Sequence, residues 1–427
     1  MAKTAQDIFN FRGVTDECIK CAKCIPVCTI YNVNPDEVTS PRGFLDLLGA
    51  YQRGNLELDK NAKDIFESCF LCTACVEVCP KSLPTDMVIE QVRSDIAKKF
   101  GIAWYKKLFF LLLRHRWMND IAFKLGWVFQ TCGFKIRADI DSMHSRFNLP
   151  MLKVDRLFPS LTKTSFLNSY PENISNGGKR KVAIFIGCLA NYNYKSIGDD
   201  LLYILKTLEI DAFLAKDQKC CSAPAYFTGD FDTVDYNAKF NIEYFESFAK
   251  DVEAIIVPEA TCSAMLKIDY EHYFHDQPEW KARAIAIRSK IFMATEWLQH
   301  HTHLEQLLKS KKKDTRIVTY HDPCHAKKMQ GLYLEPRNLI SKNYNIVEMS
   351  DPDRCCGFGG VTMQTEKYHF AKAAGAPKAA MIKETQADVV SAECSACRMQ
   401  INASMGYADV KTVFKNPIEL IAEALRK

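Results

Sequence analysis

The second half of the chain alternates between two hydrophobic patterns. Short runs of β-branched and apolar residues predict strands at residues 181–186, 254–257, 316–320 and 388–391. Between them, apolar positions recur at helical spacing and predict helices over segments such as 197–208 and 233–248. Alternating strands and helices are typical of a parallel sheet, whose ligands gather at the carboxyl ends of the strands. We therefore expect an α/β architecture in this half.

The first hundred residues show a helical pattern instead. Helical spacing predicts helices over residues 41–53, 59–68 and 85–100. We expect a multi-domain protein in which a helical domain at residues 1–100 is joined to the α/β half by a helical bridge at residues 101–178.

Composition narrows the class of protein. Of the 427 residues, 48% are hydrophobic and 25% charged, which excludes a collagenous or disordered chain. The net charge of +5 is too small to indicate nucleic-acid binding by itself. Residues 1–17 lack the apolar segment of a secretory signal, and the longest apolar run, residues 108–113, is too short to span a membrane. We expect a soluble or peripheral protein facing the cytoplasm, where thiols stay reduced.

The chain has 18 cysteines, and eight of them form two N-terminal groups. Both groups have the spacing C-x-x-C-x-x-C-x-x-x-C of bacterial ferredoxins, in which the fourth cysteine of each run binds the other cluster. Zinc is the alternative, but it prefers paired C-x-x-C knuckles to runs of four. We expect two [4Fe–4S] clusters, one on Cys18, Cys21, Cys24 and Cys79 and the other on Cys69, Cys72, Cys75 and Cys28.

The later cysteines repeat with a long period. The offsets are 136, 135, 135 and 132 residues for Cys188 and Cys324, Cys220 and Cys355, Cys221 and Cys356, and Cys262 and Cys394. The surrounding letters repeat too, since QKCCSAP resembles DRCCGFGG and EATCSAM resembles AECSACR. The repeat indicates duplication of one α/β unit, with copies at residues 179–313 and 314–427 and cysteines at the ends of their strands.

The second copy has the pattern C-x30-CC-x37-C-x-x-C, formed by Cys324, Cys355, Cys356, Cys394 and Cys397. This pattern resembles the cysteine-rich CCG domain of heterodisulfide reductases and related proteins. Two such domains after a two-cluster ferredoxin domain resemble the iron–sulfur subunits of flavin-linked dehydrogenases. The segment GCLANYNYKSIGDDL, the KCC after it and the intact C-x-x-C are most similar to the iron–sulfur subunit of anaerobic glycerol-3-phosphate dehydrogenase. SPRGFLDLL, between the N-terminal runs, is more similar to the glycolate oxidase iron–sulfur subunit.

The resemblance implies a further [4Fe–4S]-type cluster on the five thiols of the second copy. Met265 stands opposite Cys397 when Cys262 is aligned with Cys394, and a thioether replaces a thiolate on iron poorly. The first copy therefore either holds a cluster on four thiols or packs them as small buried hydrophobic residues. These four are Cys188, Cys220, Cys221 and Cys262.

Other residues near the cysteines carry weaker predictions. His321 and His325 flank Cys324; either could donate to a cluster sulfur, carry a proton or pack locally, and neither is expected to be a ligand. The glycines of CCGFGG form no nucleotide-binding fingerprint and are expected to let the backbone approach a cluster. Cys132 lies alone in an aromatic segment and is expected in the core.

Residues 98–137 are the most basic part of the chain. They contain nine Lys or Arg, ten aromatic residues and one acid, Asp120. Trp, Phe and Leu mixed with cations suit helices that lie on an anionic membrane surface. Docking of a partner protein and internal packing are the alternatives.

These features predict an electron-transfer subunit of an oxidoreductase complex, with no catalytic residue and no cofactor beyond its clusters. The resemblance implies that a separate FAD-containing subunit oxidises glycerol 3-phosphate, glycolate or lactate. Electrons would then pass through the [4Fe–4S] clusters to membrane quinone, in anaerobic respiration and glycerol metabolism. We expect peripheral attachment to the cytoplasmic face of the inner membrane and no nucleic-acid partner. The alternative is a heterodisulfide-reductase-like thiol/disulfide oxidoreductase with its active site at the CCG cluster.

Overall fold

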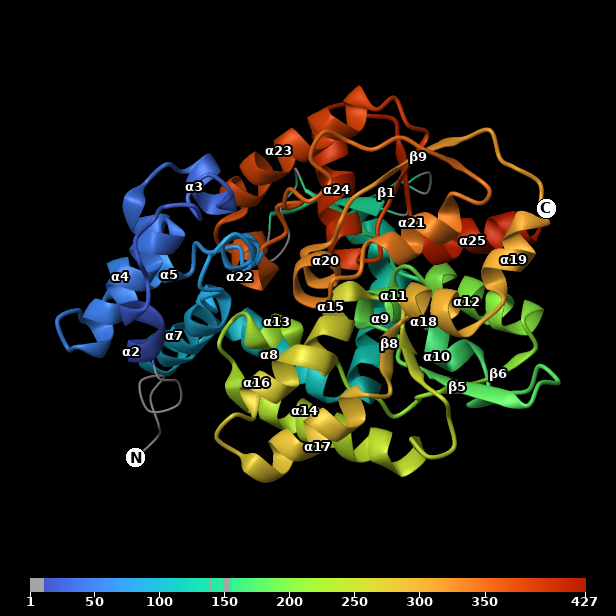
Figure 1. Ribbon diagram of the computed structural model, residues 1–427, viewed down its shortest axis with the longest axis horizontal. Coiled ribbons are helices and arrows are strands. Elements are labelled where there is room, and N and C mark those ends of the chain that lie inside the picture. Colours follow the sequence, from blue (N-terminus) through green and yellow to red (C-terminus); the bar gives the residue numbers. More distant parts are fainter. Residues whose placement is uncertain (1–10, 138–139, 141, 149–153, 155) are drawn as a thin grey trace.

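The computed structural model describes residues 11–137, 140, 142–148, 154 and 156–427. Residues 1–10, which carry much of the segment that argued against a secretory signal, lie outside the described residues. Figure 1 shows the N-terminal domain on one side and the two α/β copies on the other, with the bridge helices between them. Within the described ranges, no helix combines the length and the apolarity needed to cross a bilayer.

The N-terminal domain is helical, as the sequence predicts. Its longer helices start at clear signals: Ser40 accepts a hydrogen bond from the Gly43 amide and Pro41 follows it, while Asp59 accepts one from the Ala62 amide. The elements are α2 (Phe11–Asp16), α3 (Thr29–Val33), η1 (Glu37–Thr39), α4 (Pro41–Gln52), α5 (Lys60–Phe66), α6 (Ala74–Glu77) and α7 (Thr85–Phe100).

The bridge begins with two long helices. Helices α8 and α9 meet at His115, which ends one and caps the other. A small antiparallel sheet of order β1-β2-β3 follows, so the bridge, predicted as helical, also contains strands. The elements are α8 (Trp104–Arg114), α9 (Arg116–Gly133), β1 (Phe134–Arg137), β2 (Ser142–Ser145), β3 (Leu157–Pro159) and α10 (Phe166–Ser169).

The first α/β copy is built on a five-stranded sheet of order β4-β6-β5-β7-β8, parallel except for the short edge strand β4. Its elements are β4 (Asn173–Ile174), β5 (Arg180–Ile184), α11 (Cys188–Tyr192), α12 (Ser196–Thr207), β6 (Ile210–Leu214), α13 (Ala223–Tyr226), α14 (Phe231–Phe248), β7 (Ile255–Val257), α15 (Ala260–Ala264), the π-helix η3 (Met265–Asp269), α16 (Tyr270–Tyr273), α17 (Pro278–Arg288), β8 (Ile291–Met293), α18 (Ala294–His301) and α19 (Leu304–Lys309).

The second copy has a parallel four-stranded sheet of order β10-β9-β11-β12. All four strands predicted in the two copies are present, as β5, β7, β9 and β11. The elements are β9 (Ile317–Tyr320), α20 (Cys324–Gln330), α21 (Leu334–Ile340), β10 (Asn345–Ile346), α22 (Gly360–Thr365), α23 (Tyr368–Glu384), β11 (Val389–Ser391), α24 (Ser395–Tyr407), β12 (Val413–Lys415) and α25 (Pro417–Leu425).

The two copies pack face to face with reciprocal contacts. Helix α12 of the first copy packs on α25 of the second, and the corresponding pair, α18 and α21, also pack together. Helix α15 likewise contacts α20, while α11 contacts α24. The copies are therefore related by an approximate two-fold arrangement that brings together the ends of strands from both sheets.

The N-terminal domain is fastened to both copies. The guanidinium of Arg93, which is buried, donates to the carbonyls of Phe66 and Cys69 in its own domain and to that of Phe227 in the first copy. Met363 and Tyr368 of the second copy belong to the same hydrophobic core as helix α7. These contacts fix the N-terminal cysteine runs relative to the α/β half.

Candidate metal centres

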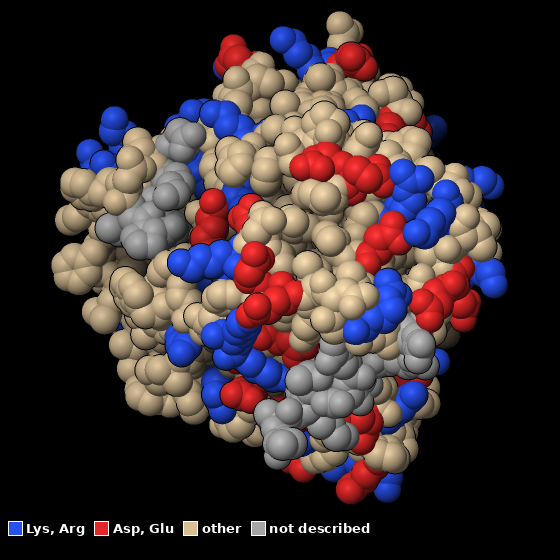
Figure 2. All heavy atoms as spheres, turned by 90° about the vertical axis from the view of Figure 1, so that its left-hand side faces the viewer, with Lys and Arg blue, Asp and Glu red and all other residues tan. Residues whose placement is uncertain are grey.

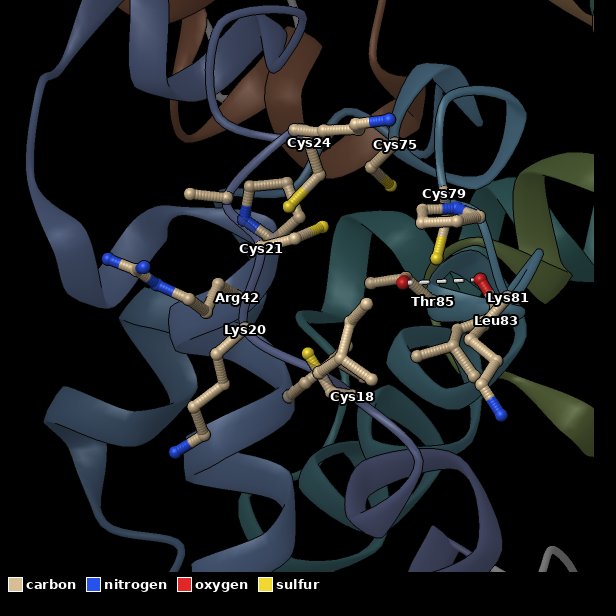
Figure 3. A pocket seen from close by; sticks show the side chains of 16 residues that line it. Cys18, Lys20, Cys21, Cys24, Arg42, Cys75, Cys79, Lys81, Leu83 and Thr85 are labelled. Carbon is tan, nitrogen blue, oxygen red and sulfur yellow. Dashed lines mark hydrogen bonds between the residues drawn. The ribbon is translucent and has the colours of Figure 1, made fainter.

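Cys18, Cys21, Cys24 and Cys79 line one pocket of the N-terminal domain, which we call site A. Figure 3 shows their sulfur atoms directed into this pocket, with Cys75 at its edge. The Cys21 side chain is exposed, so site A lies close to the protein surface. Four thiols converging on one pocket are the donor set that a [4Fe–4S] cluster takes.

Cys28, Cys69, Cys72 and Cys75 line a second pocket, site B. The fourth cysteine of each run thus lies with the first three of the other run, as ferredoxin spacing predicts. Sites A and B share Cys75 as a lining residue, so the two pockets are adjacent. Site B is enclosed more deeply, since Cys28 is buried and part of the domain core.

Both cysteine runs turn in the same unusual way. Lys20 and Ala22 in the first run, and Leu71 and Thr73 in the second, have positive φ between 52° and 63°. Such left-handed residues without glycine cost energy that surrounding structure must offset. The conformation directs thiols and amides inward; the Leu71 amide, for example, donates to the Cys69 sulfur at 3.4 Å.

Burial sets the protonation of these thiols in the metal-free protein. It raises the pKa of Cys24 and raises that of Cys69 to about 12, and burial with neighbouring thiols also raises the pKa of Cys75. Ligand cysteines bind iron as thiolates, so loading of these sites must release protons.

The second-copy site consists of Cys324, Cys355, Cys356, Cys394 and Cys397. The sulfurs of Cys356 and Cys397 are 3.4 Å apart, and the Cys397 amide donates to the Cys394 sulfur at 3.4 Å. The nitrogens of the His321 ring offer another donor, because His321, Cys356 and Cys397 have ligand atoms within 4.8 Å of one another. The sequence alone does not show which of the two histidines, His321 or His325, lies within reach of the cysteine ligands.

Thiol hydrogen bonds lower two pKa values in this site. Hydrogen bonds from Cys355 and then Cys397 lower the pKa of Cys356 to about 6, and that from Cys397 lowers the pKa of Cys394 to about 7. Burial opposes both effects. The other three thiols have raised pKa values, through burial at Cys324 and through hydrogen bonds with neighbouring thiols at Cys355 and Cys397, so binding of iron here must also displace protons.

The first-copy site brings together Cys188, Cys220, Cys221 and Cys262, with 3.4 Å between the sulfurs of Cys221 and Cys262. Its backbone matches the second copy. The Ser222 amide donates to Cys220 and the Gly357 amide to Cys355, both at 3.4 Å. Ser222 and Gly357 also share a positive φ, of 75° and 89°.

The structure corrects the alignment of the last cysteines. The amide of Phe185 donates to the carbonyl of Ile256, and the amide of His321 donates to that of Ser391. This strand register gives an offset of 135 residues, so Cys262 corresponds to Cys397, each being the third residue of its helix and 3.4 Å from the second cysteine of its CC pair.

Glu259, not Met265, therefore marks the missing thiol of the first copy. Glu259 corresponds to Cys394, and both precede their helix with extended backbone, at φ −135° and φ −148°. Met265 is fully buried in the apolar core beneath the first copy. Residues 262–264 and 394–396 are both Cys-Ser-Ala, and this identity shifts the sequence alignment by three residues from the structural one.

Both sites open onto one apolar cavity of about 420 Å³. All nine cysteines of the two copies line it, together with aromatic side chains from every domain. Phe109 of α8 and Phe123 of α9 form part of the wall. His325 also lines the cavity, where its ring stacks on Phe227 and its Nδ1 atom is 3.4 Å from the Cys324 sulfur.

Site B lies against the second-copy site. The Cys72 thiol interacts directly with that of Cys355, and it is also 3.3 Å from the Thr29 hydroxyl. A positive φ of 63° at Gly359 lets the CCGFGG loop pass Phe70, where a Cβ atom would lie 2.7 Å from the ring. Glycine at residue 359 therefore allows the backbone of this loop to pack closely against the N-terminal domain.

Cys132 is exposed on α9, so its predicted place in the core is wrong. Its neighbours Val128 and Phe129 are exposed as well. The aromatic segment that suggested a core is a surface.

Comparison with known proteins identifies the domains that carry these sites. Residues 14–83 match the 4Fe-4S dicluster domain, and residues 182–267 and 318–402 each match the cysteine-rich (CCG) domain. The chain carries a dicluster domain and two CCG domains. Two [4Fe–4S] clusters thus belong to the N-terminal domain, and the CCG domains bind a further iron–sulfur cluster.

Several relatives are similar over nearly the whole chain. The probable glycolate oxidase iron–sulfur subunit of Bacillus subtilis (strain 168) is 28% identical over 418 residues, which cover 93% of this chain and 91% of the relative. One component of the anaerobic glycerol-3-phosphate dehydrogenase of Escherichia coli (strain K12) is 26% identical, covering 96% and 98%. One component of the dihydromethanophenazine:CoB–CoM heterodisulfide reductase of Methanosarcina barkeri (strain Fusaro) is 24% identical, covering 96% and 94%.

A solved structure shares the fold. The crystal structure of a hypothetical protein from Helicobacter pylori has a TM-score of 0.54 at 9% identity and covers 99% of this chain and 76% of that chain. The names of the three relatives refer to oxidoreductases: a glycolate oxidase, a glycerol-3-phosphate dehydrogenase and a heterodisulfide reductase.

Proposed function

We propose that the chain is the electron-transfer subunit of a flavin-linked dehydrogenase complex that oxidises glycerol 3-phosphate or a small 2-hydroxy acid such as glycolate or lactate. Sites A and B would each hold one [4Fe–4S] cluster, and the second CCG domain a further cluster on its five thiols. When bound, these clusters supply one-electron transfer between an FAD-containing partner and quinone. The protein holds the thiols in place and excludes water from the inner sites.

One observation carries the proposal: the cysteine sites form a continuous line. Site A is at the surface, site B shares Cys75 with it, and Cys72 of site B interacts with Cys355 of the second CCG domain. A route from a partner protein to the inner cavity needs this order. The buried guanidinium of Arg93 keeps the domains aligned along it.

Site A offers the entry for electrons. Cys21 and Ile19 beside it are exposed, and Lys20, Lys23 and Arg42 line the pocket. Figure 2 views the N-terminal side of the molecule and shows cations and acids interspersed over this face. Such a mixed surface suits a specific protein partner, because charge pairs fix its orientation.

The cavity supports quinone as the acceptor. It is apolar, it is bounded by both CCG sites, and helices α8 and α9 contribute Phe109 and Phe123 to its wall. The other side of these helices exposes Trp104, Leu108 and Ile121. We propose that this side lies on the cytoplasmic face of the inner membrane, from which an apolar quinone reaches the cavity.

The test uses the anaerobic complex with its flavoprotein. Cys355→Ser should abolish quinone-linked turnover while the flavoprotein still reduces dyes, because Cys355 is both a proposed ligand and the contact to site B. Cys132→Ser, at an exposed cysteine away from the sites, is the matched control and should keep full turnover. Undiminished quinone reduction by the Cys355 variant would refute the proposal.

Cluster assignment has its own test. Cys21→Ser and Cys72→Ser should each remove one low-potential signal from reduced-state EPR and lower the iron content, because each thiolate binds a different cluster. Unchanged iron in both variants would mean that sites A and B do not hold the clusters.

A second candidate function is a thiol/disulfide oxidoreductase. The nine cysteines around one cavity favour it, since a disulfide substrate could meet both CCG sites at once. Reduction of a disulfide by the isolated, chemically reduced protein, without a flavoprotein, would support this function over the first.

A further inference from the structure

Glu259 stands where the first CCG domain lacks a cysteine, yet its carboxylate is directed to the other domain. One oxygen accepts a hydrogen bond from the Ser395 amide at 2.8 Å, and the other accepts one from the Ser395 hydroxyl. Ser395 is the first residue of α24, the helix that presents Cys397 and follows Cys394. The side chain is 5% exposed, so these hydrogen bonds are shielded from water.

The path of this side chain is built into the first domain. Gly187 precedes Cys188, and a Cβ atom there would lie 3.0 Å from the Cγ atom of Glu259 and 3.0 Å from the Cys262 sulfur. The absence of a side chain at residue 187 leaves the room through which Glu259 reaches α24. Glycine is therefore suited to this position for packing, since its φ of −62° is open to any residue.

Adjacent contacts repeat the connection between the domains. The Ala260 amide donates to the Glu393 carbonyl at 2.7 Å, and the Thr261 hydroxyl is 3.6 Å from the Cys394 sulfur. Three consecutive residues of the first domain thus touch the segment that carries the C-x-x-C of the second. The reciprocal position in the second domain is a cysteine, so this contact is made in one direction only.

We propose that Glu259 is a positioning residue for the iron–sulfur site of the second CCG domain. Its carboxyl group accepts one hydrogen bond from the first free amide of α24 and another from the Ser395 hydroxyl. The N-terminal turn of α24 is thereby fixed, and with it the directions of Cys394 and Cys397. Both oxygens are engaged by Ser395, so binding of Glu259 to a metal in the first domain would compete with these hydrogen bonds.

The experiment compares three variants of the full-length chain. Glu259→Ala removes both hydrogen bonds, whereas Glu259→Gln keeps them, because its oxygen can accept from the amide and its NH₂ can donate to the Ser395 hydroxyl. Glu296→Ala is the matched control: Glu296 accepts from the Met293 amide and caps α18, which carries no cysteine.

Amide hydrogen exchange of the metal-free protein gives the first measurement. Exchange at residues 395–397 should become about tenfold faster in Glu259→Ala, as expected for loss of a buried hydrogen bond, and should stay unchanged in Glu259→Gln and Glu296→Ala. Unchanged exchange in Glu259→Ala would overturn the proposal.

EPR of the iron-loaded protein gives the second measurement. The signal that Cys397→Ser removes is assigned to the second CCG domain. Glu259→Ala should lose or shift that signal and keep the signals that Cys21→Ser and Cys72→Ser remove, while Glu259→Gln should retain all of them. A loss confined to another signal, or equal losses in the Ala and Gln variants, would show that Glu259 acts as a ligand or through its charge. Neither measurement needs a flavoprotein or quinone, so the outcome is independent of the proposed electron route.

Discussion

At the scale of the residue, the strand register shows which side chain of the first copy occupies the position of a cysteine ligand in the second. Met265 and Glu259 are six residues apart. The amino-acid sequence favours Met265 as the residue that replaces a cysteine in the first copy. The hydrogen bonds between the strands show that Glu259 is the counterpart, because they identify which residues of the two copies occupy the same place in the sheet.

Met265 should therefore tolerate change without affecting iron. Met265→Cys is expected to add no ligand, since residue 265 is buried in the core below the site, and Met265→Leu should cost less than about 1.5 kcal/mol of unfolding free energy. Iron analysis and denaturant unfolding measure these effects. Additional iron bound by the Cys variant would contradict the register derived from the strands.

Asp269 is a residue for which pH should matter. It is buried beside Glu90 and Asp86, with the His325 ring opposite, and burial raises its pKa. The folded protein then keeps a proton that the unfolded chain loses above about pH 4, so stability falls as pH rises through the raised pKa. Asp269→Asn should flatten this decline, as measured by unfolding temperature between about pH 5 and 8. Parallel pH profiles of native protein and variant would exclude Asp269 as the cause.

At the scale of the element, the basic and aromatic sequence of helices α8 and α9 correctly indicates an exposed surface but not which of its lysines are exposed. Their large apolar side chains are exposed, with Trp104 at 71%, Trp117 at 65% and Phe129 at 61%. Lys107 and Lys124 are exposed among them. Lys106 instead points inward, where it pairs with Glu366 at 2.9 Å and reaches the Thr362 hydroxyl.

Binding to anionic vesicles should follow this division. Replacing Lys107 and Lys124 with Gln should weaken binding several-fold for each charge, since a cation near an anionic surface contributes about 1 kcal/mol. Replacing Trp104 and Trp117 with Ala should weaken binding at high salt too, because burial of aromatic rings is not screened. Sedimentation with anionic and neutral vesicles measures both.

Lys106→Gln is the control for this experiment. It should lower stability, because Glu366 loses its partner, and leave vesicle binding unchanged. If the charge-depleted protein still sediments but no longer copurifies with its flavoprotein, the exposed face is a docking surface for that partner.

The sequence predicted the elements and cysteine groups that depend on local spacing. Helix α7 has the predicted bounds, and the fourth cysteine of each N-terminal run lies with the opposite group. Spacing could not reveal contacts between distant segments. Lys106 is buried because it forms an ion pair with Glu366. Glu259 accepts a hydrogen bond from Ser395 because the two CCG domains pack together. Cys132 is exposed because other residues of α9 contact the rest of the protein, such as Phe123, which stacks on Tyr192.

At the scale of the whole molecule, Arg93 should control whether the domains act as one. Arg93→Ala leaves the carbonyls of Phe66, Cys69 and Phe227 without their donor, and each such loss costs about 1–3 kcal/mol when the group stays buried. We expect unfolding to split into two transitions, with protease cleavage appearing between the N-terminal domain and the rest. Calorimetry and limited proteolysis measure these changes, and a single unshifted transition would show that the apolar contacts suffice.

The reciprocal packing of the two α/β copies has an evolutionary consequence. Because α12 contacts α25 as α18 contacts α21, the chain has the arrangement of an isologous homodimer whose subunits have been joined end to end. A dimer of identical one-copy chains would bring the same two cysteine sites together, and any change at one site would appear at both. Fusion removed that constraint. In the joined chain one half carries Glu259 where the other carries Cys394, an asymmetry that two identical subunits could not have.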